Sequence, residues 1–465
     1  MRAPSLHIEP LAIAPGALLQ LASAHADRYP ILLDSAADGA LSQTSLLGAL
    51  PRGSLWIDSH AQLHAEGDLE LPRERGFFNA LEEIWRNAGA NGEQQGRPAH
   101  IPFGGGWFVY LGYEMALEVE PTLRSGWPAA SLADARPVAS ALRVPAALLR
   151  DTNGQGYLVA EPQVSAAELA MVRDDLHHAN LNPRAAEAEP PRIEATEEQP
   201  GAYIERVLRA QEYIRAGDIY QANLSRSWSA RLPVDYPAGA LYRRLRSANP
   251  APFAAFAQFG AFRVLSSSPE RLLRIRGRRV DTRPIAGTHP RGKTAVDDRA
   301  LAAAMIAHPK ERAEHVMLID LARNDLGRVC VGGSVHVDEY MAVETYAHVH
   351  HIVSNVTGEL RDDITPVQAL RAVFPGGTIT GCPKVRCMQI ISELEAAPRG
   401  PYTGSLGYLN HDGSGDFNIL IRTISLLERT LEIRAGAGIV ADSSPQRELD
   451  ESRAKARGML LALAP

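Results

Sequence analysis

In the second half of the chain, strand-like segments follow one another directly, and their order constrains the fold more than any other feature. A helical stretch at 202–217 leads into an alternating segment at 219–231, and further segments occur at 404–410, 417–428 and 431–443. Neighbouring antiparallel strands need only a short turn between them, whereas parallel strands need a long crossover, usually a helix. The pattern therefore predicts an α+β fold with large, mostly antiparallel sheets rather than a doubly wound parallel sheet.

A stretch rich in Pro, Glu and Ala at 182–200 shows almost no apolar periodicity, which predicts an exposed linker. It separates an N-terminal region, 1–181, from a second region, 201–465. The first region mixes a helical pattern at 76–89 with strand-like segments, which predicts a sheet-and-helix layer structure. These segments are 29–36, 53–59, 105–116 and 156–162.

The composition excludes several classes of protein. A formal net charge of −6 gives no basic footprint for nucleic acid. No apolar run reaches the roughly 18 residues that a membrane-spanning helix needs, and the first residues do not resemble a secretion signal. The chain has three cysteines, Cys330, Cys382 and Cys387, an odd number that disfavours a disulfide framework. We therefore expect a cytoplasmic protein that binds neither membranes nor nucleic acid.

Two helical stretches place carboxylates on a face that otherwise carries apolar or basic residues. In the first, Glu311 and Glu314 continue the stripe of Leu318 and Leu321. In the C-terminal stretch, Glu448, Glu451 and Lys455 share one face. Each pattern also fits a solvated face with ordinary ion-pair spacing. If the two pairs converge, however, their mutual repulsion requires a hard cation, and oxygen ligands of this kind suit Mg²⁺.

An anion held near such a metal also needs hydrogen-bond donors. The glycine-rich stretches "GGTITGCPKVR" (376–386) and "IRAGAGIVADS" (433–443) could turn backbone N–H groups inward, the second through Gly436, Ala437 and Gly438. Lys384 and Arg422 are candidate counter-charges. The two stretches thus predict an anion site.

Seven stretches in this order resemble the chorismate-utilising enzymes, a family that includes anthranilate, aminodeoxychorismate, isochorismate and salicylate synthases. They are "SSSPERL", "RPIAGTHPRG", "ERAEHVMLIDLARNDLGR", "GGTITGCPKVRCMQIISELE", "GSLGYL", "ILIRT" and "AGAGIVADS". The resemblance covers nearly all of 200–465 and is looser before that. It implies a Mg²⁺-dependent enzyme built from two packed sheets with helices outside, an architecture that both halves of the chain share.

The resemblance also implies a role for individual residues. Glu314 and Glu451 would bind Mg²⁺ directly, while Glu311 and Glu448 would hold metal-bound waters. Glu270 would be the general acid that protonates the departing C4 hydroxyl, because hydroxide is a poor leaving group. The residues implied around chorismate are Thr288, His351, Tyr408, Arg422, Gly436, Ala437, Gly438 and Lys455. Taken singly, each could instead be a helix cap, a core residue or a structural ion-pair partner.

Two positions bear on the nucleophile and the product. Family members that add water carry a lysine base where this chain has Gln221, which cannot deprotonate water at neutral pH. This disfavours isochorismate and salicylate formation and leaves the ammonia users, which work with a separate glutaminase subunit. At Ala286, many aminodeoxychorismate synthases carry a nucleophilic lysine, whereas anthranilate synthases have alanine.

Ala286 resembles the anthranilate synthases, but the stretches around these positions favour the other enzyme. "YQANLS", "NPAPFAAFAQF", "SSSPERLL", "FPGGTITG" and "GSLGYLNHDGSGDFNILIRT" resemble aminodeoxychorismate synthase more closely. We therefore expect component I of aminodeoxychorismate synthase, in the route to 4-aminobenzoate and folate. Anthranilate synthase component I is the alternative, and a catalytically silent binding subunit is the non-enzyme alternative. The "LLDS" segment (32–35) also resembles a tryptophan-binding stretch of the anthranilate enzymes.

Overall fold

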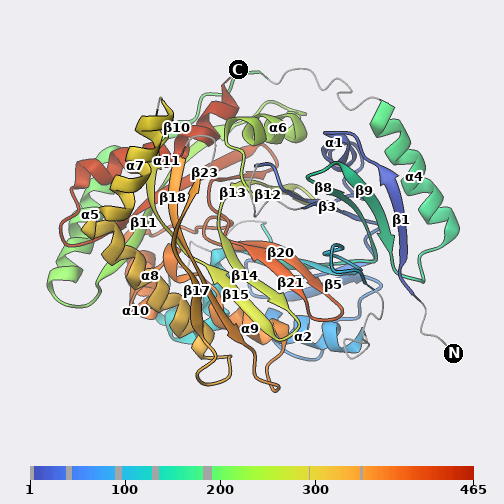
Figure 1. Cartoon of the computed structure of the whole chain (residues 1–465), viewed down its shortest axis with the longest axis horizontal. Coiled ribbons are helices and arrows are strands. Elements are labelled where there is room, and N and C mark those ends of the chain that lie inside the picture. The colour runs from blue at the N-terminus through green and yellow to red at the C-terminus, as the bar shows by residue number, and fades with distance from the viewer. Residues whose placement is uncertain are drawn as a thin grey trace.

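Two large sheets packed as a sandwich form the centre of the molecule (Figure 1). The computed structural model describes residues 5–37, 44–88, 97–127, 136–181, 191–292, 294–345 and 349–464. Within these ranges one sheet has 12 strands and the other 11, and the strands pair antiparallel. The predicted α+β class with antiparallel sheets is confirmed.

The first sheet joins strands from both ends of the chain. In spatial order it contains β1 (His7–Ala12), β9 (Gln155–Ala160), β8 (Ala146–Asp151), β3 (Thr44–Ala49), β2 (Ile31–Asp34), β12 (Phe253–Phe259), β13 (Phe262–Ser268), β22 (Thr423–Leu427), β23 (Thr430–Ile439), β11 (Gln221–Arg231) and β10 (Thr196–Glu197). A short strand, β19 (Gly381–Cys382), also pairs with the start of β11.

The second sheet mixes the two regions in the same way. Its order is β16 (Ile285–Pro290), β18 (Val349–Glu359), β15 (Arg279–Arg283), β14 (Arg271–Arg276), β21 (Gly415–Asn418), β20 (Ser405–Asn410), β6 (Gly106–Leu111), β7 (Ala139–Val144), β4 (Gly53–Ile57) and β5 (Leu63–Gly67), with β17 (His336–Thr345) paired to β18. Residues 1–181 and 201–465 thus contribute strands to both sheets and share one sandwich.

Helices cover the outer faces of the sandwich. They are α1 (Ala17–Ala24), α2 (Phe77–Asn87), α3 (Ala116–Val119), α4 (Ala166–Leu181), α5 (Pro200–Arg215), α6 (Ala238–Ala248), α7 (Ala295–Ala307), α8 (Pro309–Gly327), α9 (Pro366–Val373), α10 (Lys384–Glu395) and α11 (Pro445–Leu463), with 3-10 turns η1 (Tyr113–Met115), η2 (Pro121–Gly126) and η4 (Gly377–Ile379). Helices α5, α7, α8, α10 and α11 lie at one side of the molecule, opposite α1 and α4 (Figure 1). None of the helices in the described ranges is both long enough and apolar enough to cross a bilayer.

The core has three main layers that follow from the strand pattern. Phe108 of β6 and Leu406 of β20 face Ile31 of β2 and Ala255 of β12, so that their apolar side chains fill the space between the sheets. Two further apolar clusters lie on the outer faces of the sandwich, one between each sheet and the helices that cover it. Burial of these side chains is the main favourable term in folding, and it fixes the strand ends from which the candidate site is built.

The predicted linker is not uniformly free of structure. Residues 182–190 lie outside the described ranges, but the following residues pack against the C-terminal helix and β11. Ile193 N–H donates to Leu463 O at 2.9 Å, and Glu197 of β10 forms ion pairs with Arg226 and Arg453, each at 2.8 Å. The chain therefore enters α5 from an edge strand of the first sheet.

Candidate functional site

Three elements distant in sequence meet at the start of β11. Gln221 is the first residue of this strand, and its Nε2 donates to Glu314 Oε1 of α8 at 3.2 Å. Gly438 of β23 lies against the same amide, since a Cβ at this position would stand 2.1 Å from Gln221 Nε2. A side chain at this position would therefore displace the Gln221 amide. The structure thus brings together Gln221, one predicted metal carboxylate and the glycine-rich strand.

The predicted metal carboxylates of α8 and α11 influence one another electrostatically. The pKa of Glu314 is raised, first by burial and then by the negative charges of Glu311 and Glu451. Lys455 Nζ lies 2.7 Å from Glu451 Oε1. Burial alone would lower the pKa of Lys455, but the carboxylate of Glu451 outweighs it and raises that pKa. Glu448 lies one turn before Glu451 on α11.

This arrangement suits a hard cation, although it is not a closed coordination shell. No group of three or more His, Cys, Asp or Glu side chains within the described ranges lies close enough together to hold a metal as arranged. The pKa of Glu314 is raised mainly by burial, and the charges of Glu311 and Glu451 add to this rise, against the charge of Lys455. Carboxylate oxygens are the ligands that Mg²⁺ takes, and a cation would relieve this repulsion. The residues therefore suit Mg²⁺ by their chemistry, although the described side chains are not arranged as a coordination site.

Glu270 has the properties of an acid that is protonated near neutral pH. It lies between β13 and β14, is buried, and accepts a hydrogen bond from Thr378 Oγ1 at 2.7 Å. Burial raises its pKa to about 7, against the hydrogen bond from Thr378 and the charge of Arg422, which lower it. A carboxyl group in this state can donate a proton. The sequence analysis singled out the stretch that contains Thr378 but did not identify this contact.

His351 and Arg422 form a pair in which the imidazole is neutral. Arg422 Nη2 lies 3.5 Å from His351 Nε2, and His351 Nδ1 lies 3.2 Å from Gly287 O. Because a guanidinium only donates, Nε2 accepts and Nδ1 carries the proton. Burial, followed by the charge of Arg422, lowers the pKa of His351 to about 3. His351 therefore orients Arg422 and does not act as a base.

The strand β16 carries two predicted site residues. The backbone of Thr288 pairs with that of His351 in β18, but the side chain of Thr288 lies outside the described set. Ala286 is buried against Leu318 and Leu321 of α8, on the helix that carries Glu311 and Glu314. A Cβ on the intervening Gly287 would stand 2.9 Å from Glu311 Oε2. Strand β16 therefore lies directly against the carboxylate face of α8.

Tyr408 does not join this group. It lies on β20, where its ring meets Phe103 edge to face at 5.8 Å, and it lines a separate cavity of about 110 Å³ with Asp34 and Arg271. The tyrosine that interacts electrostatically with Lys455 is instead Tyr402, which precedes β20. The structure therefore does not bring Tyr408 to the group around Glu314, because strand alternation turns it toward the N-terminal region, and Tyr402 is the tyrosine that lies closer to this group.

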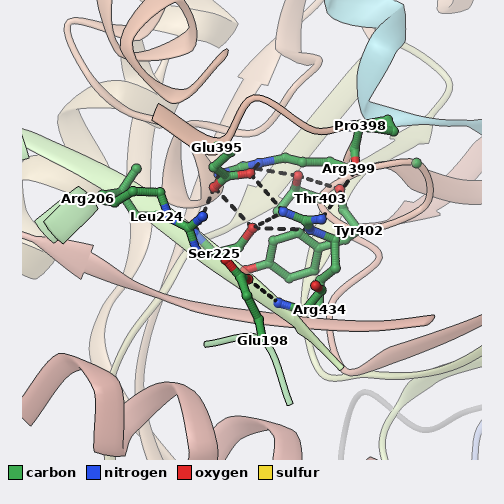
Figure 2. Close-up of polar contacts among 12 residues, drawn as sticks. Glu198, Arg206, Leu224, Ser225, Glu395, Pro398, Arg399, Tyr402, Thr403 and Arg434 are labelled. Carbon is green, nitrogen blue, oxygen red and sulfur yellow. Dashed lines mark hydrogen bonds and ion pairs between the residues drawn. The ribbon is translucent and has the colours of Figure 1, made fainter. Parts of the chain in front are cut away.

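A buried ion network lies behind Tyr402 (Figure 2). Glu395 accepts from Arg399 at 2.6 and 2.9 Å, from Arg434 at 3.2 Å and from Ser225 N–H at 2.7 Å. Arg399 also donates to the carbonyls of Asn223 at 2.6 Å and Ile379 at 3.2 Å. The network ties β11, η4 and β23 together, and nothing in the sequence motifs indicated it.

Comparisons with known proteins identify the family of this chain. A family model described as chorismate binding enzyme matches residues 41–461. An anthranilate synthase component I-like protein of Synechocystis sp. is 39% identical over 398 residues, covering 86% of this chain and 81% of the relative. Aminodeoxychorismate synthase component 1 of Bacillus subtilis is 50% identical over 261 residues, which cover 56% of this chain and 55% of the relative. Anthranilate synthase component I from Streptococcus pneumoniae has a similar structure, with a TM-score of 0.78 at 30% identity over 91% of this chain and 93% of that one.

Proposed function

The chain belongs to the family of chorismate-binding enzymes, and we propose that it is component I of an aminodeoxychorismate synthase. In this role it would convert chorismate and ammonia to 4-amino-4-deoxychorismate and water. The observation that carries the choice of nucleophile is Gln221, whose amide points at Glu314 where a water-adding relative would need a base. Ammonia needs no such base because its neutral form is already nucleophilic.

Glu270 would supply the acid for the departure of the C4 hydroxyl. As ammonia bonds to the ring at C2, the double bonds shift, the C4–O bond breaks and the proton of Glu270 passes to the departing hydroxide, which leaves as water. A second ammonia then bonds at C4, the double bonds shift back, and the first nitrogen, bound at C2 as an ammonium group, leaves as ammonia. The excess proton on the nitrogen at C4 is the one that Glu270 regains. Its pKa of about 7 allows both halves of the cycle.

The charged groups around the site would hold the substrate, a dianion. Arg422, oriented by His351, and Lys455, beside Glu451, are the cations available to its carboxylates. We propose that Glu314 and Glu451 hold Mg²⁺ directly and that Glu311 and Glu448 hold its waters. The ion would offset part of the charge of the four acids and bind a substrate carboxylate.

The position of the amino group separates the two candidate products. For the para product, a nucleophile at C2 must be replaced by a second one at C4, and Ala286 provides no lysine for the first addition. Ammonia can serve as that transient first nucleophile, so alanine is compatible with the para product. The stretches around the site favour aminodeoxychorismate. Ala286 and the relatives named anthranilate synthase favour the alternative product, anthranilate, formed with loss of pyruvate.

Two partners follow from this proposal. A separate glutaminase subunit would supply ammonia, with free ammonium as a substitute at high concentration. Tryptophan would bind in the 110 Å³ cavity, which Asp34 of the "LLDS" segment lines together with Arg271 and Asp416. The carboxylates of Asp34 and Asp416 suit its amino group, and Arg271 suits its carboxylate.

Chorismate consumption tests the proposal against the silent-subunit and water-adding alternatives. Purified protein is mixed with chorismate, with and without ammonium, in Mg²⁺ or in chelator, and chorismate is followed by chromatography. We expect consumption only when both ammonium and Mg²⁺ are present. Consumption without ammonium that yields isochorismate would contradict the proposal, as would no consumption at all.

A further inference from the structure

A small cavity lies next to Glu270. It has a volume of about 20 Å³, and its polar lining includes the side chains of Glu270, Thr282, Asp325 and Thr378. A cavity needs about 10–15 Å³, with a few polar groups around it, to hold one water. This cavity therefore has the size and the lining that a single buried water needs.

The cavity leads away from the predicted metal carboxylates along α8. Leu318, Ala322 and Asp325 line it, and each lies about one turn farther from Glu314 than the one before. Among the described residues, neither of the cations proposed to hold chorismate lines it. The cavity is therefore separate from the proposed substrate site and touches it only at Glu270.

Asp325 joins the cavity to the protein surface. Its Oδ2 accepts a hydrogen bond from Lys384 Nζ at 2.6 Å, and the side chains of Asp325 and Lys384 are 11% and 13% exposed. Burial raises the pKa of Asp325, against the charges of Lys384 and Arg328 and the hydrogen bond from Lys384, which lower it. Asp325 can therefore take up a proton from solvent more readily than an ordinary exposed aspartate can.

Thr378 joins the cavity to Glu270. Its Oγ1 donates to Glu270 Oε1 at 2.7 Å, and it also lines the cavity. The turn that carries Thr378 is held by Thr380 Oγ1, which donates to Gly376 O at 3.0 Å. A hydroxyl can accept one hydrogen bond while it donates another. Thr378 can therefore receive a proton from a water in the cavity as it passes its own to Glu270.

Glu270 needs such a route because the proposed reaction consumes its proton in every turnover. The side chain lies in a residue that is only 4% exposed, and bound chorismate would cover the side from which the proton leaves. The charged groups that act on Glu270 are Arg422 and Lys455. A guanidinium does not give up its proton, and the carboxylate of Glu451 keeps Lys455 charged. The proton must therefore return from another side.

We propose that Asp325, one water in the cavity and Thr378 form the path that returns a proton to Glu270, an inference that rests on the proposed function. Asp325 first takes a proton from solvent, which has received the excess proton of the product nitrogen. Asp325 passes this proton to the water, the water passes one of its own to Thr378 Oγ1, and the hydroxyl hydrogen of Thr378 moves to the ionised Glu270. Asp325 is then a carboxylate again, and the net change is one proton moved from solvent to Glu270. Asp325 thus acts on the reaction only through Glu270.

Two substitutions interrupt this path in different ways. Asp325→Asn keeps the shape of the side chain but cannot carry the proton. Val373→Ile adds a methylene to a residue that lines the cavity and leaves every charge in place. Val367→Ile is the matched control, because Val367 lies on the same helix, α9, and is as deeply buried, at 1% exposed against 2% for Val373. Val367 is not among the described residues that line the cavity.

The measurement separates the first turnover from the later ones. Protein is equilibrated with Mg²⁺ and ammonium below about pH 7, where Glu270 starts protonated, and is mixed rapidly with excess chorismate. We expect Asp325→Asn and Val373→Ile to complete the first turnover within about twofold of the wild-type rate and then to slow at least about tenfold, which gives a burst of about one product per chain. The burst should shrink as the starting pH rises through about 7.

The outcomes separate the proton path from the proposed function. If the wild-type protein does not aminate chorismate, the proposed function fails. If it does, and either variant slows the first turnover as much as the later ones, the substitution acts only on the structure and the path is overturned while the function stands. Steady-state turnover equal to that of Val367→Ile in either variant also overturns the path. If Asp325→Asn does not fold because Lys384 loses its partner, Val373→Ile against Val367→Ile carries the comparison.

Discussion

Replacing Glu270 with glutamine should make the protein more stable at high pH while abolishing its chemistry. Burial raises the pKa of Glu270 to about 7 from an ordinary value of 4.5. The folded state therefore holds this proton more tightly than the unfolded state does. Below about pH 4.5 the carboxyl is protonated in both states, and its burial carries no ionisation cost. Above about pH 7 it is ionised in both states, and the folded state bears the full cost.

The size of the effect follows from the same two values. The difference between 4.5 and about 7 corresponds to about 3 kcal/mol of folding free energy at the alkaline end. Glutamine never ionises, so Glu270→Gln removes this cost. Glutamine can keep the hydrogen bond from the Ile285 N–H through its amide oxygen. Any remaining change in hydrogen bonding is independent of pH, so the pH dependence of the difference is the quantity that tests the reasoning.

The assay is thermal unfolding of Glu270→Gln and the wild type across this pH range, with Glu205→Gln on the exposed face of α5 as the matched control. The advantage of Glu270→Gln should grow from about pH 4.5 to about pH 7 and then stay constant. Turnover at constant free ammonia should fall at least about 100-fold in the variant. A stability difference that does not change with pH, or retained turnover, would refute the assignment of Glu270 as a buried acid.

Two further predictions concern the charges around the site. Glu314→Gln should raise the melting temperature in chelator, because it removes one of the crowded carboxylates, and should abolish any further rise on adding Mg²⁺; a full Mg²⁺ response in this variant would exclude Glu314 as a ligand. Glu395→Gln should destabilise the protein by about 3–5 kcal/mol, since it leaves Arg399 buried without a counter-charge, while Arg434 keeps only Glu432. Unchanged thermal unfolding would show that the network in Figure 2 contributes little to folding.

Helical periodicity predicts the helices that carry Glu314 and Glu451, and α8 and α11 form at these positions. The charge of Glu451 acts on Glu314 in the structure, while the role of both residues as metal ligands stays a prediction. The antiparallel sheets were also predictable, because the strand-like segments lack helices between them. Spacing could not show that both sheets would combine strands from 1–181 and 201–465.

Contacts over long sequence distances could not be read from the pattern. Tyr402 and Tyr408 lie in one short stretch, and only the direction of β20 decides which of them approaches Lys455. Arg399 reaches the carbonyl of Asn223, 176 residues away. The composition of 182–200, which predicts a linker, could not reveal β10 for the same reason. An edge strand is defined by its hydrogen bonds to its partner, here β11, and not by its own composition.

Identification of the product tests the proposed function most directly. The purified protein is incubated with chorismate, Mg²⁺ and ammonium, with and without an aminodeoxychorismate lyase, and the products are identified by chromatography and mass spectrometry. We predict 4-amino-4-deoxychorismate, which the lyase converts to 4-aminobenzoate. Anthranilate and pyruvate formed without the lyase would contradict this and would show that Ala286 marks an ortho-aminating enzyme.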